Sequence, residues 1–204
     1  MAIDRILQKG KLGFPGGRGA SQDLILDKMS DNPRQERLAM RTAAVDRTEP
    51  DSSNSFQANS AQLILSSYRA LTGQSLIGED SLGVSAAEAL YRAPVVILAH
   101  DATTDPVFFY ANLAAQTLFE LPWCDLVRLP SRLSAEPLAR DDRARLLEEV
   151  SRQGYIDNYA GVRISRSGKR FRIRQATVWN LVTPDTAVRG QAAAFSRWDF
   201  LGAS

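Results

Sequence analysis

The side chains in this chain that could take part in chemistry are few. His100 is the only histidine and Cys124 is the only cysteine. A Ser-His-Asp catalytic set, or a haem held by histidine, would have to use His100. A single cysteine can form neither an intramolecular disulfide nor a cysteine cage around a metal. We therefore predict no catalytic residue and no metal site. We interpret His100 either as a ligand contact or as a strand-end histidine bonded to the neighbouring turn.

Two patterns that are common in enzymes are incomplete here. The stretch Gly16-Gly17-Arg18-Gly19 lacks both a preceding strand and the Gly-Lys-Ser/Thr ending of a phosphate-binding loop. Asp141 and Asp142 fall on a helix face that pairs its charges at i, i+4, which does not indicate a two-carboxylate acid–base site. The chain is therefore predicted not to be an enzyme. The alternative is a small enzyme that uses His100 or Arg132.

Arginines offer a different chemistry, the binding of anions. Arg132 follows Leu129-Pro-Ser on a non-helical connection, where it could bind a carboxylate or phosphate in a bidentate manner or bridge this connection to the sheet. A basic stripe is predicted on a later hairpin, and it could contact nucleic acid or an acidic partner. The alternative is a solvated outer face that discourages edge pairing, which the small net charge of +2 favours. The stripe consists of Arg163, Lys169, Arg170, Arg172 and Arg174.

The hydrophobic pattern predicts the elements that position these residues. Val95–Leu98 is a continuous apolar run, typical of a strand buried on both faces, and Val107–Tyr110 is the next strand. Asn112 is placed to cap the helix that follows. The longest helix is predicted over residues 136–153. Three strands finish the chain, over residues 156–165, 169–181 and 188–198.

The order of these elements predicts the fold class. Two strands, a group of helices and three antiparallel strands indicate an α+β fold, with a five-stranded antiparallel sheet and helices on one side. In the first of the three late strands we assign Ile156, Ala160, Val162 and Ile164 to the buried face.

The N-terminal region differs from the rest in composition. It is rich in glycine, basic residues and serine, and it cannot bury much apolar surface. We predict a flexible N-terminal extension over residues 1–55 and one folded domain over 56–204. An alternative start of translation at Met29 or Met40, rather than at Met1, stays open.

Helices open the predicted domain. The first covers residues 58–71, with Gly73 at its end and an apolar stripe that we expect to contact a partner chain or a second copy. Ser85 and Glu88 form a predicted capping box for a shorter helix that reaches about Tyr91.

Length and charge limit the class of protein. The 204 residues suit one domain plus an appendage. The longest apolar run, Ala93–Ala99, is far below the roughly 18 residues of a membrane span. No apolar secretory signal opens the chain. We therefore predict a cytoplasmic protein without a membrane partner.

The order of elements, with Tyr110-Ala-Asn112 at the end of the second strand, resembles the PAS fold. More specifically, a series of short pieces resembles, in order and spacing, the MEKHLA domain over roughly residues 63–198. This PAS-related family occurs in bacteria and at the C-terminus of certain plant homeodomain–leucine zipper proteins, and the resemblance is to the standalone bacterial type. The pieces are Tyr110-Ala-Asn112, Leu118-Phe119-Glu120, Leu129-Pro-Ser-Arg132, Gly154-Tyr-Ile156, Tyr159-x-Gly161-Val-Arg163-Ile-Ser165, Val178-Trp179-Asn180 and Gly190-Gln-Ala-Ala193.

The resemblance implies a sensory or interaction module and supplies no catalytic residues. In PAS-like folds the region of Tyr110 and Asn112 borders an interior cavity. Asn112 could equally be only a helix cap, and the tryptophans only core residues. The predicted cavity contacts are His100, Tyr110, Asn112, Trp123, Arg132 and Trp179.

The predicted function is that of a sensory module. It would bind a small ligand or a protein partner, in signalling or regulation, and act through a partner chain or a homodimer. No cofactor is indicated. The alternatives are a nucleic-acid-associated regulator that uses the basic hairpin, although nucleic acid is not the expected partner, and a small enzyme that uses the cavity.

Overall fold

The computed structural model describes residues 46–78, 85–135 and 140–202. The helix predicted over 136–153 is therefore described from Arg140 onward. The first half is mostly helical and contains η1 (Ser52–Asn54), α2 (Ala58–Thr72), α3 (Ala86–Arg92), β1 (Val96–Asp101), β2 (Phe108–Ala111), α4 (Leu113–Phe119), α5 (Trp123–Leu126) and η2 (Ser131–Ser134). The second half contains α6 (Arg140–Gln153), β3 (Tyr155–Ile164), β4 (Arg170–Val182), β5 (Val188–Phe195) and β6 (Arg197–Phe200).

All strand pairs in the sheet are antiparallel, which confirms the predicted α+β class. The strand order is β2-β1-β5-β4-β3, and β6 adds to β4. The sequence predicts one strand over 188–198, but this segment breaks at Ser196. β5 pairs with the second half of β4, whereas β6 pairs with the first half, at Phe171–Arg174. The sheet therefore has six strands rather than five.

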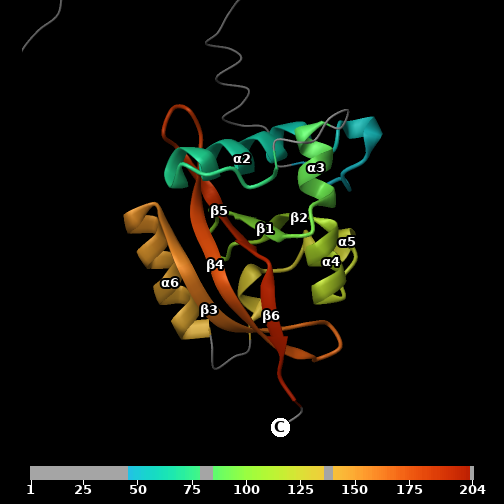
Figure 1. Ribbon diagram of the computed structural model, residues 1–204, viewed down its shortest axis with the longest axis vertical. Helices are drawn as coiled ribbons and strands as arrows, with labels where there is room; N and C mark the ends of the chain where they lie inside the picture. Colours follow the sequence, from blue (N-terminus) through green and yellow to red (C-terminus); the bar gives the residue numbers. More distant parts are fainter. Residues whose placement is uncertain (1–45, 79–84, 136–139, 203–204) are drawn as a thin grey trace, which may run out of the picture. The chain divides into compact units, whose positions relative to one another are not determined.

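Helices cover both faces of this sheet, which corrects the prediction that they lie on one side. On one face, called here the α2 face, α2 and α3 pack against alternate residues of β1, β4 and β5. On the other, called the α6 face, α4 and α6 pack against the intervening residues. In Figure 1, α2 runs across the upper end of the sheet, with α6 beside β3 and β4 and with α4 and α5 at the opposite side. This double cover explains why Val96 to His100 are all buried, as the continuous apolar run predicts.

Local signals fix the ends of the two N-terminal helices. Gly73 ends α2 in the left-handed region, at φ 72°, and its N–H donates to the Arg69 carbonyl. The Ser85 hydroxyl accepts from the Glu88 N–H at 3.2 Å and so caps α3. The reciprocal half of the predicted capping box does not form, because the Glu88 carboxylate pairs with Arg92 instead.

The apolar stripe of α2 lies against the sheet. Ala61, Ile64 and Tyr68 are buried, and Tyr68 packs edge-on against Trp179 with ring centroids 4.9 Å apart. The partner contact expected for this stripe is therefore wrong, since the domain's own α2 face covers it.

Residues 46–57 form a strap that lies against the domain. The Trp123 indole N–H donates to the Arg47 carbonyl at 2.8 Å, and the Tyr91 hydroxyl contacts the Glu49 carboxylate at 3.0 Å. Burial raises the pKa of Tyr91 to about 12, so this hydroxyl stays a donor at neutral pH. Residues 1–45 of the predicted extension lie outside the described residues. Residues 46–55, the described part of the predicted extension, pack against the domain, because their polar groups bond to the buried side chains of Trp123 and Tyr91.

Candidate functional site

A partly open cavity lies on the α6 face, between the sheet, α4, η2 and α6. Its volume is about 40 Å³. This is the volume open to the centre of a water-sized sphere, of which one buried water needs roughly 10–15 Å³. The cavity therefore corresponds to about three water-sized positions. The walls are mainly apolar, and besides the hydroxyl of Tyr159 four polar side chains from four elements interrupt them. These four are His100, Ser134, Arg163 and Gln191.

Arg163 is the charged member of the cavity. It is 8% exposed, although it belongs to a ten-residue strand with open positions elsewhere. Its guanidinium donates to the Val162 carbonyl at 2.9 Å and to the Tyr159 hydroxyl at 3.3 Å, and it lies 5.5 Å from the centre of the Tyr159 ring. All these partners are neutral. Within the described part of the chain, Arg163 has no ion pair.

Gly161 makes this arrangement of Tyr159 and Arg163 sterically accessible. The three residues alternate along β3 and share one face. A Cβ atom at Gly161 would collide with the Tyr159 hydroxyl and lie 3.0 Å from a guanidinium nitrogen of Arg163. The Tyr159 side chain therefore crosses over Gly161 to reach the arginine. Any larger residue at this position would separate them.

His100 stands at the β1 end of the cavity. Its ring Nδ1 is 2.9 Å from the Asp101 carbonyl oxygen, and its ring lies edge-on to Phe108. The β5 backbone runs very close to it, because Gly190 opposes Asp101, and a Cβ atom at Gly190 would overlap the His100 carbonyl. His100 thus has the turn contact of the simpler interpretation and also a place in the cavity wall.

Gln191 ties the sheet to the helix above the cavity. Its side-chain N–H groups lie 3.0 Å from the Leu147 carbonyl and 3.1 Å from the Ser151 hydroxyl, both on α6. The Asn180 side chain lies 3.1 Å away on β4, and it donates to the Val150 carbonyl. These bonds fix α6 over the cavity.

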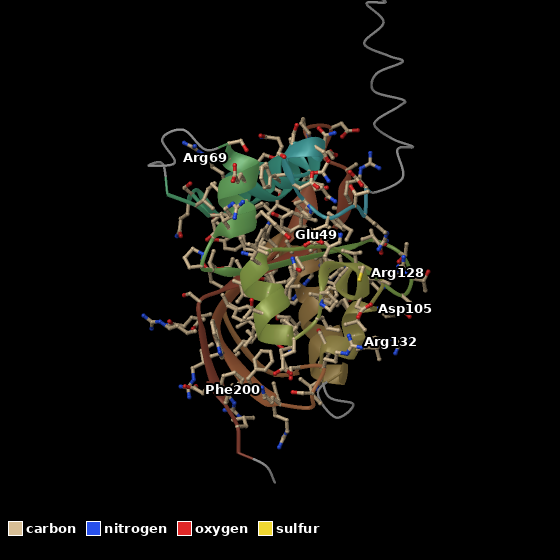
Figure 2. All side chains as sticks on the ribbon, turned by 90° about the vertical axis from the view of Figure 1, so that its right-hand side faces the viewer. Glu49, Arg69, Asp105, Arg128, Arg132 and Phe200 are labelled. Atoms are coloured by element: carbon tan, nitrogen blue, oxygen red, sulfur yellow. The ribbon has the colours of Figure 1, made fainter. Side chains whose placement is uncertain are left out.

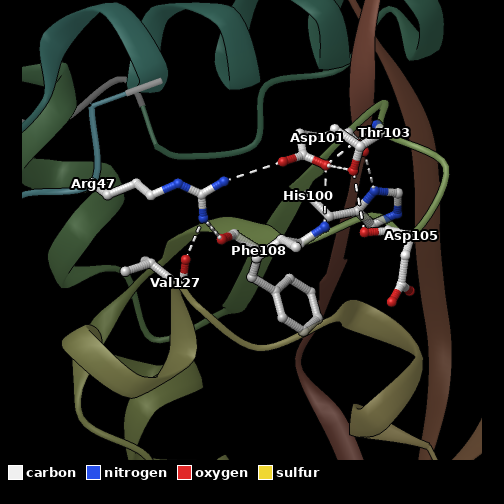
Figure 3. A network of polar contacts seen from close by, with 8 residues as sticks. Arg47, His100, Asp101, Thr103, Asp105, Phe108 and Val127 are labelled. Atoms are coloured by element: carbon white, nitrogen blue, oxygen red, sulfur yellow. Dashed lines mark hydrogen bonds and ion pairs between the residues drawn. The ribbon is translucent and has the colours of Figure 1, made fainter. Parts of the chain in front are cut away.

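A polar network joins the His100 end of the cavity to the strap (Figure 3). Arg47 donates to the Phe108 carbonyl at 2.7 Å and to the Val127 carbonyl, and it pairs with the Asp101 carboxylate at 3.1 Å. Burial pushes the pKa of Asp101 upward, but hydrogen bonds from Thr103 and from the Val107 N–H, together with Arg47, outweigh burial. The pKa therefore lies below its ordinary value, and the carboxylate is charged at neutral pH.

The structure does not bring the six predicted cavity contacts together. Only His100 lines the cavity. Tyr110, Trp123 and Trp179 belong to the core cluster of the α2 face. The alternation along β2 and β4 turns Tyr110 and Trp179 away from α6. Trp123 begins α5 and packs edge-on against Tyr110. Burial raises the pKa of Tyr110, whose hydroxyl has no hydrogen-bond partner in the part of the chain that the structure describes.

Asn112 is buried and acts as a structural joint. Its Oδ1 accepts from the Ala115 N–H at 3.1 Å, as the predicted helix cap, and from the Ile97 N–H at 3.0 Å. Its side-chain amide donates to the Val95 carbonyl at 2.7 Å and the Ala93 carbonyl at 3.1 Å. Asn112 therefore links α4 to the segment that leads into β1 instead of lining the cavity.

Arg132 is exposed, and Asp105 engages its guanidinium. The two side chains form a bidentate pair, with nitrogen–oxygen distances of 3.0 and 3.1 Å, and they lie together at the surface in Figure 2. Of the two interpretations of Arg132, this geometry matches the structural bridge, here between η2 and the β1–β2 turn.

Charge pairs occur along the predicted basic stripe. Lys169 pairs with Glu120, and Arg174 pairs with Asp199. Hydrogen bonds from Lys169, Ser167 and Ser165 lower the pKa of Glu120 to about 2. Arg172 is exposed, whereas Arg170 is half-buried.

Arg163 does not belong to this surface stripe, which corrects the prediction. Asn158 adopts a left-handed conformation, at φ 59°, and the pairing of β3 with β4 shifts register on both sides of Tyr159. Beyond this irregularity, the β3 residues expected to face solvent point inward, and those expected to point inward face solvent. Arg163 becomes buried, while Ala160, assigned to the inward face, is exposed. The Tyr-x-Gly-x-Arg spacing was the available signal, because only glycine lets the two larger side chains meet.

Within the described segments, no helix is long and apolar enough to cross a membrane. The same segments contain no group of three His, Cys, Asp or Glu side chains that could hold a metal ion.

The antiparallel sheet with this strand order, helices over both of its faces and a cavity on the α6 face define a PAS-like α+β domain. The model of the MEKHLA domain matches residues 58–200, and the chain belongs to this family. The homeobox-leucine zipper protein ATHB-9 of Arabidopsis thaliana is 30% identical over 146 residues, which is 68% of this chain. The match spans only 17% of that plant protein.

Solved structures of two kinds are similar to this chain at 14% sequence identity. One is the PAS domain of a protein from Colwellia psychrerythraea, with a TM-score of 0.47, covering 53% of this chain and 89% of that one. Another is a light-oxygen-voltage domain studied with a flavin analogue, with a TM-score of 0.46, covering 60% of this chain and 88% of that one.

Proposed function

We propose that this chain is a sensory module whose cavity on the α6 face binds a small molecule without transforming it. The observation that carries the proposal is the cavity itself, a mainly apolar, partly open space with His100 and Arg163 in its wall. Ligand sites in proteins are typically concave and apolar, with a few polar groups that fix orientation.

The signal would leave the cavity through the strap. His100 lines the cavity, and the next residue, Asp101, holds Arg47. Arg47 also bonds to the carbonyls of Phe108 and Val127. A ligand that shifts the end of β1 would change all three contacts and so alter how residues 46–57 sit on the domain. A partner chain or a second copy would respond to this change.

Family membership supports a sensory function more than a nucleic-acid function. The name of the plant relative refers to a homeobox and a leucine zipper, but the match covers less than a fifth of that protein. In this chain, two of the basic residues on the hairpin are already paired with carboxylates. We therefore do not extend DNA binding to it.

Native mass spectrometry of the full chain purified from its cells tests the proposal, followed by thermal-shift screening of small molecules. Ala193→Leu fills the cavity from β5, and Ala160→Leu adds the same atoms at an exposed site of β3. We expect a small molecule to bind to the wild type and to Ala160→Leu, and binding to be at least tenfold weaker in Ala193→Leu. The proposal is wrong if no compound binds the wild type, or if Ala193→Leu binds equally well.

A further inference from the structure

Arg163 indicates the chemical class of the ligand. An arginine side chain stays protonated at every physiological pH, so its charge cannot be removed by titration. Moving a cation out of water costs several kcal/mol unless an opposite charge or a full set of hydrogen bonds compensates for it. Arg163 is 8% exposed, and its partners are one carbonyl and one phenol.

The guanidinium is held in place rather than left to reach solvent. Long basic side chains at a domain surface usually extend their charge into water. Here the Tyr159 ring lies against the guanidinium, and Gly161 removes the side chain that would otherwise keep the two apart. A glycine inside a strand weakens the strand. The buried guanidinium and the strand glycine both lower the stability of the domain by itself. Both would help to bind an anion beside Arg163.

The walls and the volume narrow the choice of anion. Leu98, Phe119 and Phe195 are among the lining residues, so most of the ligand would contact apolar surface. About three water-sized positions accommodate a ligand of roughly two to four carbon atoms. A planar carboxylate matches the guanidinium fork through two parallel hydrogen bonds. Inorganic phosphate offers the same fork but has no apolar part to meet these walls.

We propose that the cavity binds a short aliphatic carboxylate, with Arg163 as its counter-charge. This inference rests on the proposed function, since it assigns a ligand class to the same cavity. The carboxylate lies against the guanidinium, and its alkyl part lies among the leucine and phenylalanine side chains of the α6 face.

Isothermal titration calorimetry of the full chain with sodium acetate, propionate and butyrate, at constant ionic strength, tests this assignment. Arg163→Met keeps the length of the side chain and removes its charge, and Arg163→Lys keeps the charge but loses the fork. Arg172→Met is the matched control, because Arg172 is exposed on the neighbouring strand. Circular dichroism establishes that each variant is folded.

We expect saturable binding of at least one of the three acids to the wild type and to Arg172→Met. Affinity should fall at least tenfold in Arg163→Met and by a smaller factor in Arg163→Lys. Equal affinity in Arg163→Met overturns the assignment, as does binding of inorganic phosphate as strong as that of the best carboxylate. Absence of carboxylate binding to the wild type also overturns it.

The two proposals fail in different ways. A neutral compound that binds the wild type, is lost in Ala193→Leu and is unaffected in Arg163→Met would overturn the carboxylate assignment and leave the sensory cavity intact. If no compound of any class binds the wild type, both proposals are wrong.

Discussion

The two faces of one sheet bury very different side chains. On the α2 face, Trp179 is fully buried, its indole N–H lies 3.1 Å from the Ser67 hydroxyl, and its ring packs on Tyr68. On the α6 face, the sheet buries the charge of Arg163 beside a cavity. Because neighbouring residues of a strand point to opposite faces, each strand contributes to both. We therefore expect the α2 face to supply stability and the α6 face to lose some stability by burying the charge of Arg163, a cost that the proposed ligand would offset.

Truncation of Trp179 should have the largest effect. Trp179→Ala removes a fully buried ring, its hydrogen bond to Ser67 and its contact with Tyr68, so we expect a loss of about 3–5 kcal/mol in the free energy of unfolding, measured with urea. Trp198→Ala is the matched control on β6, where the ring is only half-buried. It should cost less than half as much. Equal losses would contradict the larger contribution to stability that we assign to the α2 face.

Asn112 is the joint between the helices of the two faces, and its loss should come next. Asn112→Ala removes the cap of α4, worth about 1 kcal/mol, and leaves the Ile97 N–H and the Val95 carbonyl without this side-chain partner. Orphaned buried groups cost about 1–3 kcal/mol each, so we expect a total loss of at least about 3 kcal/mol by urea unfolding. Asn112→Ser can restore only the cap and should recover about 1 kcal/mol. Full recovery would show that the other bonds contribute nothing.

The parts of this fold that sequence reasoning predicts are those set by local physics. The β1 run, the Asn112 cap and the end of α2 at Gly73 each depend on a few adjacent residues, and the structure agrees with them. The phase of β3 was predicted wrongly because one left-handed residue, Asn158, reverses it. Strict alternation contains no information about such a bulge.

The candidate site was predicted less well for the same reason. Arg163 moves from the surface into the cavity with the reversed phase of β3, and Arg132 is engaged by Asp105, a residue 27 positions earlier in the chain. Such pairing depends on how the β1–β2 turn meets η2, which no local pattern specifies. The prediction for His100 depends only on its being the single histidine, and its position near the end of β1 places it in the cavity wall.

Arg163 provides the sharpest test of the α6 face. In the ligand-free protein, Arg163→Met removes a buried charge whose partners are all neutral, so the free energy of unfolding should rise by up to about 2 kcal/mol or stay unchanged. Arg172→Met, at an exposed position, should change it by less than about 0.5 kcal/mol. Urea unfolding of both variants in a buffer without carboxylates measures the difference. A loss of stability above 1 kcal/mol in Arg163→Met would mean that the arginine stabilises the empty domain, and the contrast between the faces would then be wrong.

Substitution of Tyr110 should have the smallest effect, and it tests whether the α2 face contains a polar group that contributes to stability. Its hydroxyl is buried and has no hydrogen-bond partner among the described residues, so Tyr110→Phe should leave the free energy of unfolding unchanged to within about 0.5 kcal/mol, or raise it slightly. Tyr91→Phe is the matched control, because the Tyr91 hydroxyl contacts Glu49 and Gln116, and its loss should cost about 1 kcal/mol. Urea unfolding distinguishes the two outcomes. A cost at Tyr110 equal to that at Tyr91 would mean that this hydroxyl takes part in a polar contact, and the α2 face, like the α6 face, would then hold a polar group that needs a partner.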